Sequence, residues 1–211
     1  QLASALNEFA LQGASFNLLN SEFDKLTGAA GELSSKVLSE LDLAAKGSIR
    51  QRDLILAANK ANLLGVADES RELTQLMEVA VARGDALGRS TTDAFNDIVT
   101  GLGRSSALIL DNLGIIVDIE KINKQYAESV GKTVQQLSEQ EKKQALVNAV
   151  IADSQRLLSN GISVASQNQS KIESLNAAWG DLSDTIAARF TPVLAEVADQ
   201  TGKALDKVSE Y

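Results

Sequence analysis

Apolar residues recur every three or four positions along most of this chain. Leu73, Leu76 and Met77 form one such stripe, and a longer stripe covers residues 146–158. This spacing matches the 3.6-residue period of an α-helix. The alternation typical of β-strands is almost absent, and only the β-branched run at residues 115–119 approaches it. The pattern therefore predicts an all-α fold.

Glycines and capping residues predict where the helices begin and end. Glycine is favoured just past a helix end because it accepts a positive φ without a Cβ clash. Residues 90–93 and 138–141 each place an acidic residue three positions after a serine, which is typical of a helix start. We expect an irregular bundle of about seven to ten helices, with longer helices at about 133–160 and 163–190. The glycines that separate segments are Gly28, Gly31, Gly47, Gly65, Gly84, Gly88, Gly101, Gly103, Gly114, Gly131 and Gly161.

The most regular apolar stripe lies toward the C-terminus. A stripe of this kind faces a partner helix, either within the chain or on another subunit. A lone Trp on such a stripe is typical of a core or interface, although it could also serve as a ligand platform. Because Pro192 disfavours a continuous helix, we expect one helix to end near residue 190 and another to begin at Pro192 with Thr191 as its cap. The stripe consists of Ile172, Leu175, Trp179, Leu182, Ile186 and Phe190.

The sequence shows only weak signals of a domain boundary. No repeat of fixed period is visible, and no Pro-rich or Ser-rich linker divides the sequence. We expect a compact helical region at 1–131 and a long-helix region at 132–211 that packs on it or on other copies; a single domain is the alternative. The chain starts without Met and already in a helical pattern, so we interpret it as a piece of a longer protein.

Composition narrows the chemistry. The 211 residues include no His and no Cys, and the net charge is -8. The missing residue types exclude an imidazole base, a thiolate nucleophile, a disulfide framework and a Cys/His zinc site. The acidic balance disfavours binding to nucleic-acid phosphates. We therefore expect no catalytic residues, no cofactor, no metal and no specific nucleic-acid partner.

Two motifs resemble functional ones and are better explained by local structure. Gly101 and Gly103 resemble the start of a phosphate-binding loop, but position 106 is Ser and no strand precedes the pair. We interpret the pair as a tight turn between helices, from which Arg104 reaches a helix-end carbonyl or Asp111. Asp111 and Asn112 interrupt an apolar run, and we interpret them as an Asx turn or a helix cap.

The same central region is similar to a known family. The segment AFNDIVTGLGRSSALILDNLGI at residues 94–115 closely resembles part of the tail tape measure proteins of long-tailed bacteriophages and prophages. The similarity extends over roughly residues 50–195. In the family pattern we expect Ile, Gly and Pro where this chain has Leu102, Ser105 and Ala107. The most specific positions of the motif are Gly101, Gly103, Arg104, Ile109, Leu110, Asp111, Asn112, Leu113 and Gly114.

The resemblance implies a structural role without an active site. Members of this family form an extended helical polymer that sets the length of the tail tube and leaves the tube when DNA is ejected. The implied partners are further copies of the chain, tail tube and tail tip proteins, tail assembly chaperones and, at ejection, the host membrane. The implied location is the lumen of the virion tail tube, and the host cytoplasm during assembly. Because glycines interrupt the helices so often, we expect a compact or bent region of such a protein.

Two other functions stay open at this stage. Helices rich in Ala, Leu and Val with many glycines are compatible with a membrane-active protein. A cell-wall-degrading enzyme needs only two carboxylates and no His. The candidates for such a pair lie in lysine-rich stretches typical of a solvated helix face. They are Glu120, Glu128, Glu139 and Glu141.

Overall fold

The predicted all-α fold is confirmed. The structure is a computed structural model that describes residues 2–26, 32–66, 70–159, 173–189, 191–192 and 196, and within these ranges it contains helices and no strand. A further helix, which has no label in the figures, covers residues 173–189. The labelled helices are α1 (Leu2–Leu26), α2 (Glu32–Ala44), α3 (Gln51–Leu63), α4 (Ser70–Leu87), α5 (Thr91–Gly103), α6 (Ala107–Asp111), α7 (Ile119–Ser129), the 3-10 turn η1 (Val134–Gln136) and α8 (Glu139–Ser159).

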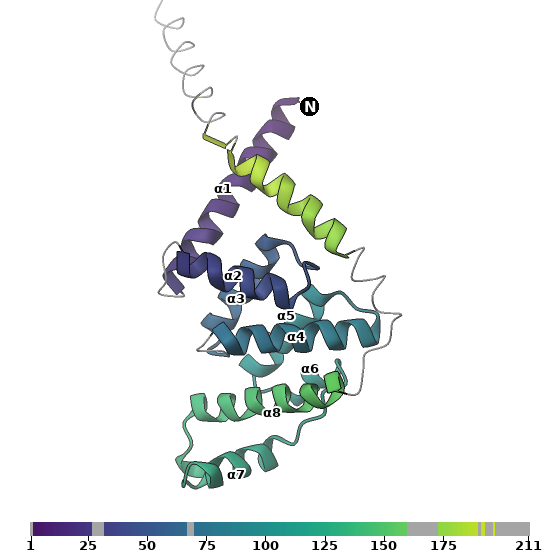
Figure 1. Cartoon of the computed structure of the whole chain (residues 1–211). Helices are drawn as coiled ribbons and strands as arrows, with labels where there is room; N and C mark the ends of the chain where they lie inside the picture. Colours follow the sequence, from purple (N-terminus) through teal and green to yellow (C-terminus); the bar gives the residue numbers. More distant parts are fainter. Residues whose placement is uncertain are drawn as a thin grey trace, which may run out of the picture.

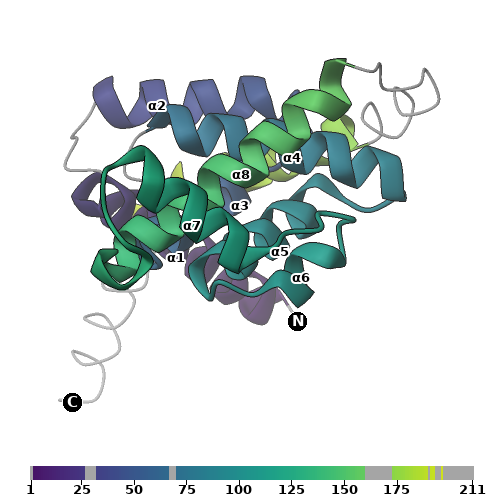
Figure 2. The same cartoon turned by 90° about the horizontal axis from the view of Figure 1, so that it is seen from below.

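Helix α4 lies at the centre of the bundle. It packs against α2 on one side, α5 on another and α8 on a third (Figure 1). Helix α7 packs along α8 at the end of the molecule farthest from α1, as the view from below shows (Figure 2). At the opposite end, α1 and the 173–189 helix cross each other above α2 and α3 (Figure 1). The division into regions 1–131 and 132–211 stays a prediction.

The predicted apolar stripes supply the core. Leu76 and Met77 of α4 are fully buried, and Leu73 is 3% exposed. On α8, the buried side chains of Leu146 and Val150 join the same cluster. The core thus reaches from α1 and α2 to α8. The 3.6-residue period correctly predicted which sides of α4 and α8 face this core.

Both predicted capping segments are confirmed. The hydroxyl of Ser90 accepts a hydrogen bond from the backbone N–H of Asp93 at 3.1 Å and begins α5. The hydroxyl of Ser138 accepts from the N–H of Glu141, whose carboxylate accepts from the N–H of Ser138 in return. Helix α8, which corresponds to the helix predicted at about 133–160, therefore begins at Glu139, and the predicted start near residue 133 is wrong. Thr133 instead opens the separate turn η1, and Leu137 is extended between the two.

The glycine prediction is correct at some positions and wrong at others. Among the described residues, five glycines have positive φ: Gly47, Gly65, Gly88, Gly114 and Gly131. Gly84 lies inside α4, and Gly101 and Gly103 lie inside α5, so the predicted turn at the latter pair is wrong. These two glycines allow close helix packing, as described below. Gly28, Gly31 and Gly161 lie outside the described residues.

The C-terminal helix is confirmed over residues 173–189, whereas 163–172 and Phe190 lie outside the described residues. Thr191 and Pro192 are themselves helical. The hydroxyl of Thr191 donates to the carbonyl oxygen of Ala187, four residues earlier, at 2.8 Å. That bond is the one a threonine makes inside a helix, so the prediction that Thr191 caps a new helix is wrong.

Candidate functional site

The central motif forms the junction between α5 and α6. A Cβ atom on Gly101 would lie 2.8 Å from Leu110 Cδ2, and one on Gly103 would lie 2.8 Å from Leu64 Cβ. Both distances are shorter than real contacts allow. The two glycines therefore let α6 and the end of α3 approach the backbone of α5, which is a packing role.

The motif then turns the chain out of α6. The N–H of Gly114 donates to the carbonyl of Asp111, and the N–H of Ile115 donates to the carbonyl of Leu110. Gly114 has φ +65°, which glycine adopts without strain. Asp111 and Asn112 are both exposed at this helix end. Asn112 is the C-cap residue, in agreement with the interpretation of the pair as a local helix end.

The remaining motif residues divide into core and surface. Leu110 and Leu113 are fully buried, and Ile109 is half-buried beside Gly101. Arg104 is exposed, and no ion pair between described residues joins it to Asp111, which is one of the two partners predicted for it. The structure therefore brings the motif together as a packed junction.

The resemblance leads us to expect Gly and Pro where this chain has Ser105 and Ala107. The backbone conformation at both positions suits the expected residues. Ser105 has φ +48°, a conformation that favours glycine over serine. Ala107 is the first residue of α6, a position where proline is favoured. The preceding residue, Ser106, has φ −101° and ψ 101°, which a following proline tolerates.

The C-terminal apolar stripe faces away from the bundle. Its exposed fractions are 73% for Leu175, 76% for Trp179, 50% for Leu182 and 40% for Ile186. These four side chains, which we call the outer stripe, follow one another at steps of four, three and four residues. Ile172 and Phe190 lie outside the described residues. Within the part of the chain that the structure describes, no helix covers these four side chains.

The opposite face of the 173–189 helix packs on the bundle through small and polar residues, and we call it the docked face. A Cβ on Gly13 of α1 would lie 2.5 Å from the carbonyl oxygen of Ala187, and one on Gly180 would lie 2.0 Å from Arg50 Cδ. The helices thus meet almost backbone to backbone. The docked face comprises Glu173, Ser174, Ala177, Gly180, Asp181, Asp184 and Ala187.

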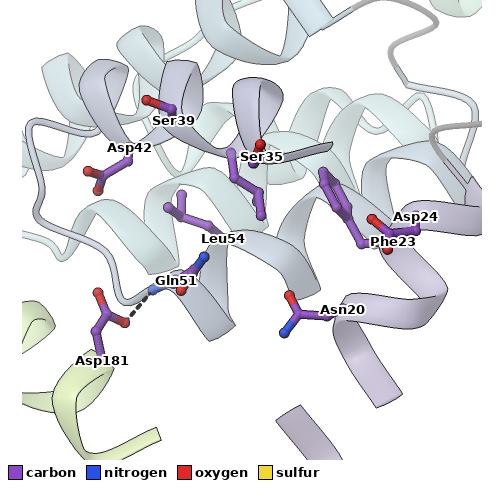
Figure 3. A pocket seen from close by; sticks show the side chains of 10 residues that line it. Asn20, Phe23, Asp24, Ser35, Ser39, Asp42, Gln51, Leu54 and Asp181 are labelled. Atoms are coloured by element: carbon purple, nitrogen blue, oxygen red, sulfur yellow. Dashed lines mark hydrogen bonds between the residues drawn. The ribbon is translucent and has the colours of Figure 1, made fainter. Parts of the chain in front are cut away.

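A cleft of about 560 Å³ opens beside this docked face (Figure 3). Asp181 lines it from the 173–189 helix, Asp42 from α2 and Asp24 from α1. The backbone N–H of Gln51 donates to Asp181 Oδ1 at 2.7 Å. Sequence reasoning missed this cleft, because its residues come from four segments and share no motif. The only available signal was the spacing of small and acidic residues opposite the apolar stripe.

Burial changes the pKa values of two carboxyl groups that line the cleft. Burial raises the pKa of Asp42 above its ordinary value. Burial likewise raises the pKa of Asp181, and the negative charges of Asp42 and Asp184 raise it further. The hydrogen bond from the N–H of Gln51 and the positive charge of Arg50 lower the same pKa. Asp181 is half-buried and Asp42 is exposed, and the pKa of both carboxyl groups is shifted in the same direction.

The carboxylates considered for glycoside hydrolysis are placed elsewhere. Glu120 and Glu128 are exposed on α7. Glu139 pairs with Lys142 at 2.7 Å, and Glu141 pairs with Lys132 at 2.5 Å. None of the four lines the cleft. Among the described residues, no group of three or more acidic side chains has the arrangement of a metal site.

No protein-family model matches the chain, and no solved structure matches it. Within the part of the chain that the structure describes, no helix combines the length and the apolar character needed to cross a membrane.

Proposed function

We propose that this chain is a segment of a phage tail tape measure protein, a scaffold that sets the length of the tail tube and leaves it when DNA is ejected. The observation that carries the proposal is the outer stripe: an all-helical chain presents its most regular apolar side chains outward. Its function, on this proposal, is to pack against other helices and not to transform a substrate.

The surroundings of the outer stripe favour further copies of the chain as partners. Four positions beside the stripe, Asn176, Ala178, Ser183 and Thr185, are uncharged, and the exposed Arg189 follows Ile186 by three residues. Flanking charges normally select or repel a partner helix. In a chain with net charge -8, a face without acidic side chains lets two copies approach with less like-charge repulsion. Small flanking side chains also leave room for the indole of Trp179.

The geometry of the motif supports the family assignment. The family pattern has Gly and Pro where this chain has Ser105 and Ala107. The backbone at these positions has a positive φ and a first helical turn, respectively. Each geometry favours the family residue.

The proposal is tested by the length of the tail. An in-frame deletion of these 211 residues from the complete gene is expected to shorten the tails seen by electron microscopy. At about 1.5 Å per helical residue, the decrease is at most about 320 Å. A matched control replaces Leu175 and Leu182 by Ser without changing the chain length, and should alter the yield of tails but not their length. Tails of unchanged length in the deletion strain would refute the proposal.

Self-association is tested on the isolated chain by light scattering. We expect a concentration-dependent increase in mass that Trp179→Ser with Leu182→Ser abolishes. Leu108→Ser is the matched control, because Leu108 is 82% exposed but lies on α6, away from the outer stripe. A mass that is constant with concentration, or lost equally in the control, would contradict this part of the proposal.

The other two functions are separated by direct assays. Leakage from lipid vesicles that depends on Trp179 would assign the outer stripe to a membrane. Release of soluble fragments from purified peptidoglycan would assign the chain to cell-wall degradation. Tight binding to duplex DNA at physiological salt would contradict the expectation that an acidic tape does not adhere to DNA in the same lumen.

A further inference from the structure

The 173–189 helix is attached to the bundle with its polar face inward. Its buried apolar side chains are only Ala177 and Ala187, whereas the outer stripe leaves two leucines, an isoleucine and a tryptophan exposed. Burial of apolar surface normally holds a helix in place, in proportion to the area removed from water. Here two alanines are the only apolar side chains of this helix that are almost fully removed from water. Its position therefore depends on polar contacts and on close backbone packing.

Three carboxylates provide those polar contacts. Gln12 of α1 donates to Asp184 at 2.5 Å, and the hydroxyl of Thr91 donates to Glu173 at 3.3 Å. The N–H of Gln51, the first residue of α3, donates to Asp181. Arg50, the N-cap residue of α3, makes no side-chain cap bond. Asp181 thus caps the start of α3 from a helix 130 positions further along the chain.

The charges around these contacts are mainly negative. Asp24 of α1 and Asp42 of α2 face Asp181 across the cleft (Figure 3). Asp184 is 2% exposed, and its Oδ2 atom has no hydrogen-bond partner. The positive groups on the same side are already engaged: Arg50 binds Asp53 at 3.0 Å, and Arg52 donates to Ser15 of α1.

We propose that the 173–189 helix is a pH-sensitive latch, which docks more tightly on α1 and α3 when the carboxyl groups of Asp181 and Asp42 take up protons and loosens when they are ionised. A protonated carboxyl still accepts a hydrogen bond through its carbonyl oxygen, so the cap on α3 is kept. The repulsion between Asp181 and Asp42 is then removed. Because the latch depends only on these contacts, it does not rest on the tail function proposed above.

The direction of the pH dependence follows from the acidity of the two groups in the cleft. Burial raises the pKa of both Asp42 and Asp181 above the ordinary value of 3.8. Undocking returns Asp181 to water and removes its charge from the neighbourhood of Asp42. The docked state therefore binds protons more tightly than the undocked state, and docking weakens as the pH rises through the raised values. The effect is complete below pH 3.8 and is lost as the pH rises above the raised pKa values.

The experiment uses the complete chain and its single Trp, which lies on the latch itself. Local mobility of Trp179 is measured by time-resolved fluorescence anisotropy, at a concentration where light scattering gives the monomer mass. Backbone hydrogen exchange over residues 176–187 is compared between variants at one pH. Asp181→Asn keeps an acceptor for Gln51 but removes the charge, whereas Asp181→Ala removes both. Glu128→Gln, on exposed α7, is the matched control for loss of one negative charge.

At neutral pH we expect Asp181→Asn to slow exchange of the 176–187 amides by about twofold to fivefold, the size of a single interaction between partly exposed charges. It should also reduce the pH dependence of Trp179 mobility. Asp181→Ala should accelerate exchange, and the control should change neither. If Asp181→Asn equals the wild type, or loosens the helix as Asp181→Ala does, the proposal is wrong. Asp42→Asn repeats the test from across the cleft without altering any hydrogen bond of the latch.

Discussion

Because α5 and α6 approach closely at Gly101, the loss of stability caused by a larger side chain there can be predicted. In Gly101→Ala, the new methyl group would lie 2.8 Å from Leu110 Cδ2 and 2.9 Å from Leu110 Cγ. Overpacking of this kind costs about 1–3 kcal/mol. Replacing Gly by Ala inside a helix returns about 0.5–1 kcal/mol. We therefore expect Gly101→Ala to lower the free energy of unfolding by about 1–2 kcal/mol.

The partner substitution separates this clash from a general loss of stability. Leu110 is fully buried, so Leu110→Ala should cost about 2–5 kcal/mol through the cavity that it leaves. In the double variant, the atoms that collide with the new methyl group are absent. The double variant should therefore be more stable than the sum of the two single changes predicts, by about 1–2 kcal/mol.

Urea unfolding followed by circular dichroism at the helix band measures all three variants. Gly131→Ala is the control, because Gly131 has φ +68° and no atom within 4 Å of the added Cβ. It should cost about 1–2 kcal/mol and add independently to Leu110→Ala. Additivity between Gly101→Ala and Leu110→Ala within about 0.5 kcal/mol would refute the close contact. So would a more stable Gly101→Ala.

Three further predictions follow from single contacts. Ser105→Gly should raise stability by about 0.5–1 kcal/mol, because Ser105 has φ +48°, and a lower melting temperature would contradict this. Ser90→Ala should lower the free energy of unfolding by about 1 kcal/mol, since it removes the cap on α5, and an unchanged urea midpoint would exclude this role. Hydrogen bonds from Lys132 and from the N–H of Ser138 lower the pKa of Glu141 to about 2. The contribution of the ionised Glu141 to stability is complete above pH 4.5 and is lost as the pH falls toward 2. Glu141→Gln should therefore reduce the loss of stability over that pH range. An NMR titration of Glu141 with a midpoint near 4.5 would contradict this prediction.

Local signals predicted the fold where the local chemistry alone decides the structure. The serine caps at Ser90 and Ser138 needed only an acid three residues later, and both are confirmed. The buried faces of α4 and α8 followed from a period that packing must respect. The predicted helix start near residue 133 failed because Thr133 caps a turn of its own, and capping chemistry does not show how many turns follow.

The errors share a different cause, which is distance along the chain. Gly101 and Gly103 were interpreted as turn residues, because a glycine pair looks the same whether it ends a helix or admits another one. The direction of the outer stripe was left open, since a period identifies an apolar face but not its partner. The bond between Asp181 and Gln51 joins residues 130 positions apart, and no local pattern indicates it.

The crossing of α1 with the C-terminal helix has a consequence for measuring length. The hydroxyl of Thr191 donates to the carbonyl oxygen of Ala10 at 3.3 Å, across 181 positions of sequence. A polypeptide whose two ends lie side by side lengthens a longer strand that contains it only by the width of its folded bundle. Drawn out as a helix, the same stretch would add about 270 Å. The shortening caused by the deletion therefore also tells whether this segment stays folded inside a tail or is pulled straight.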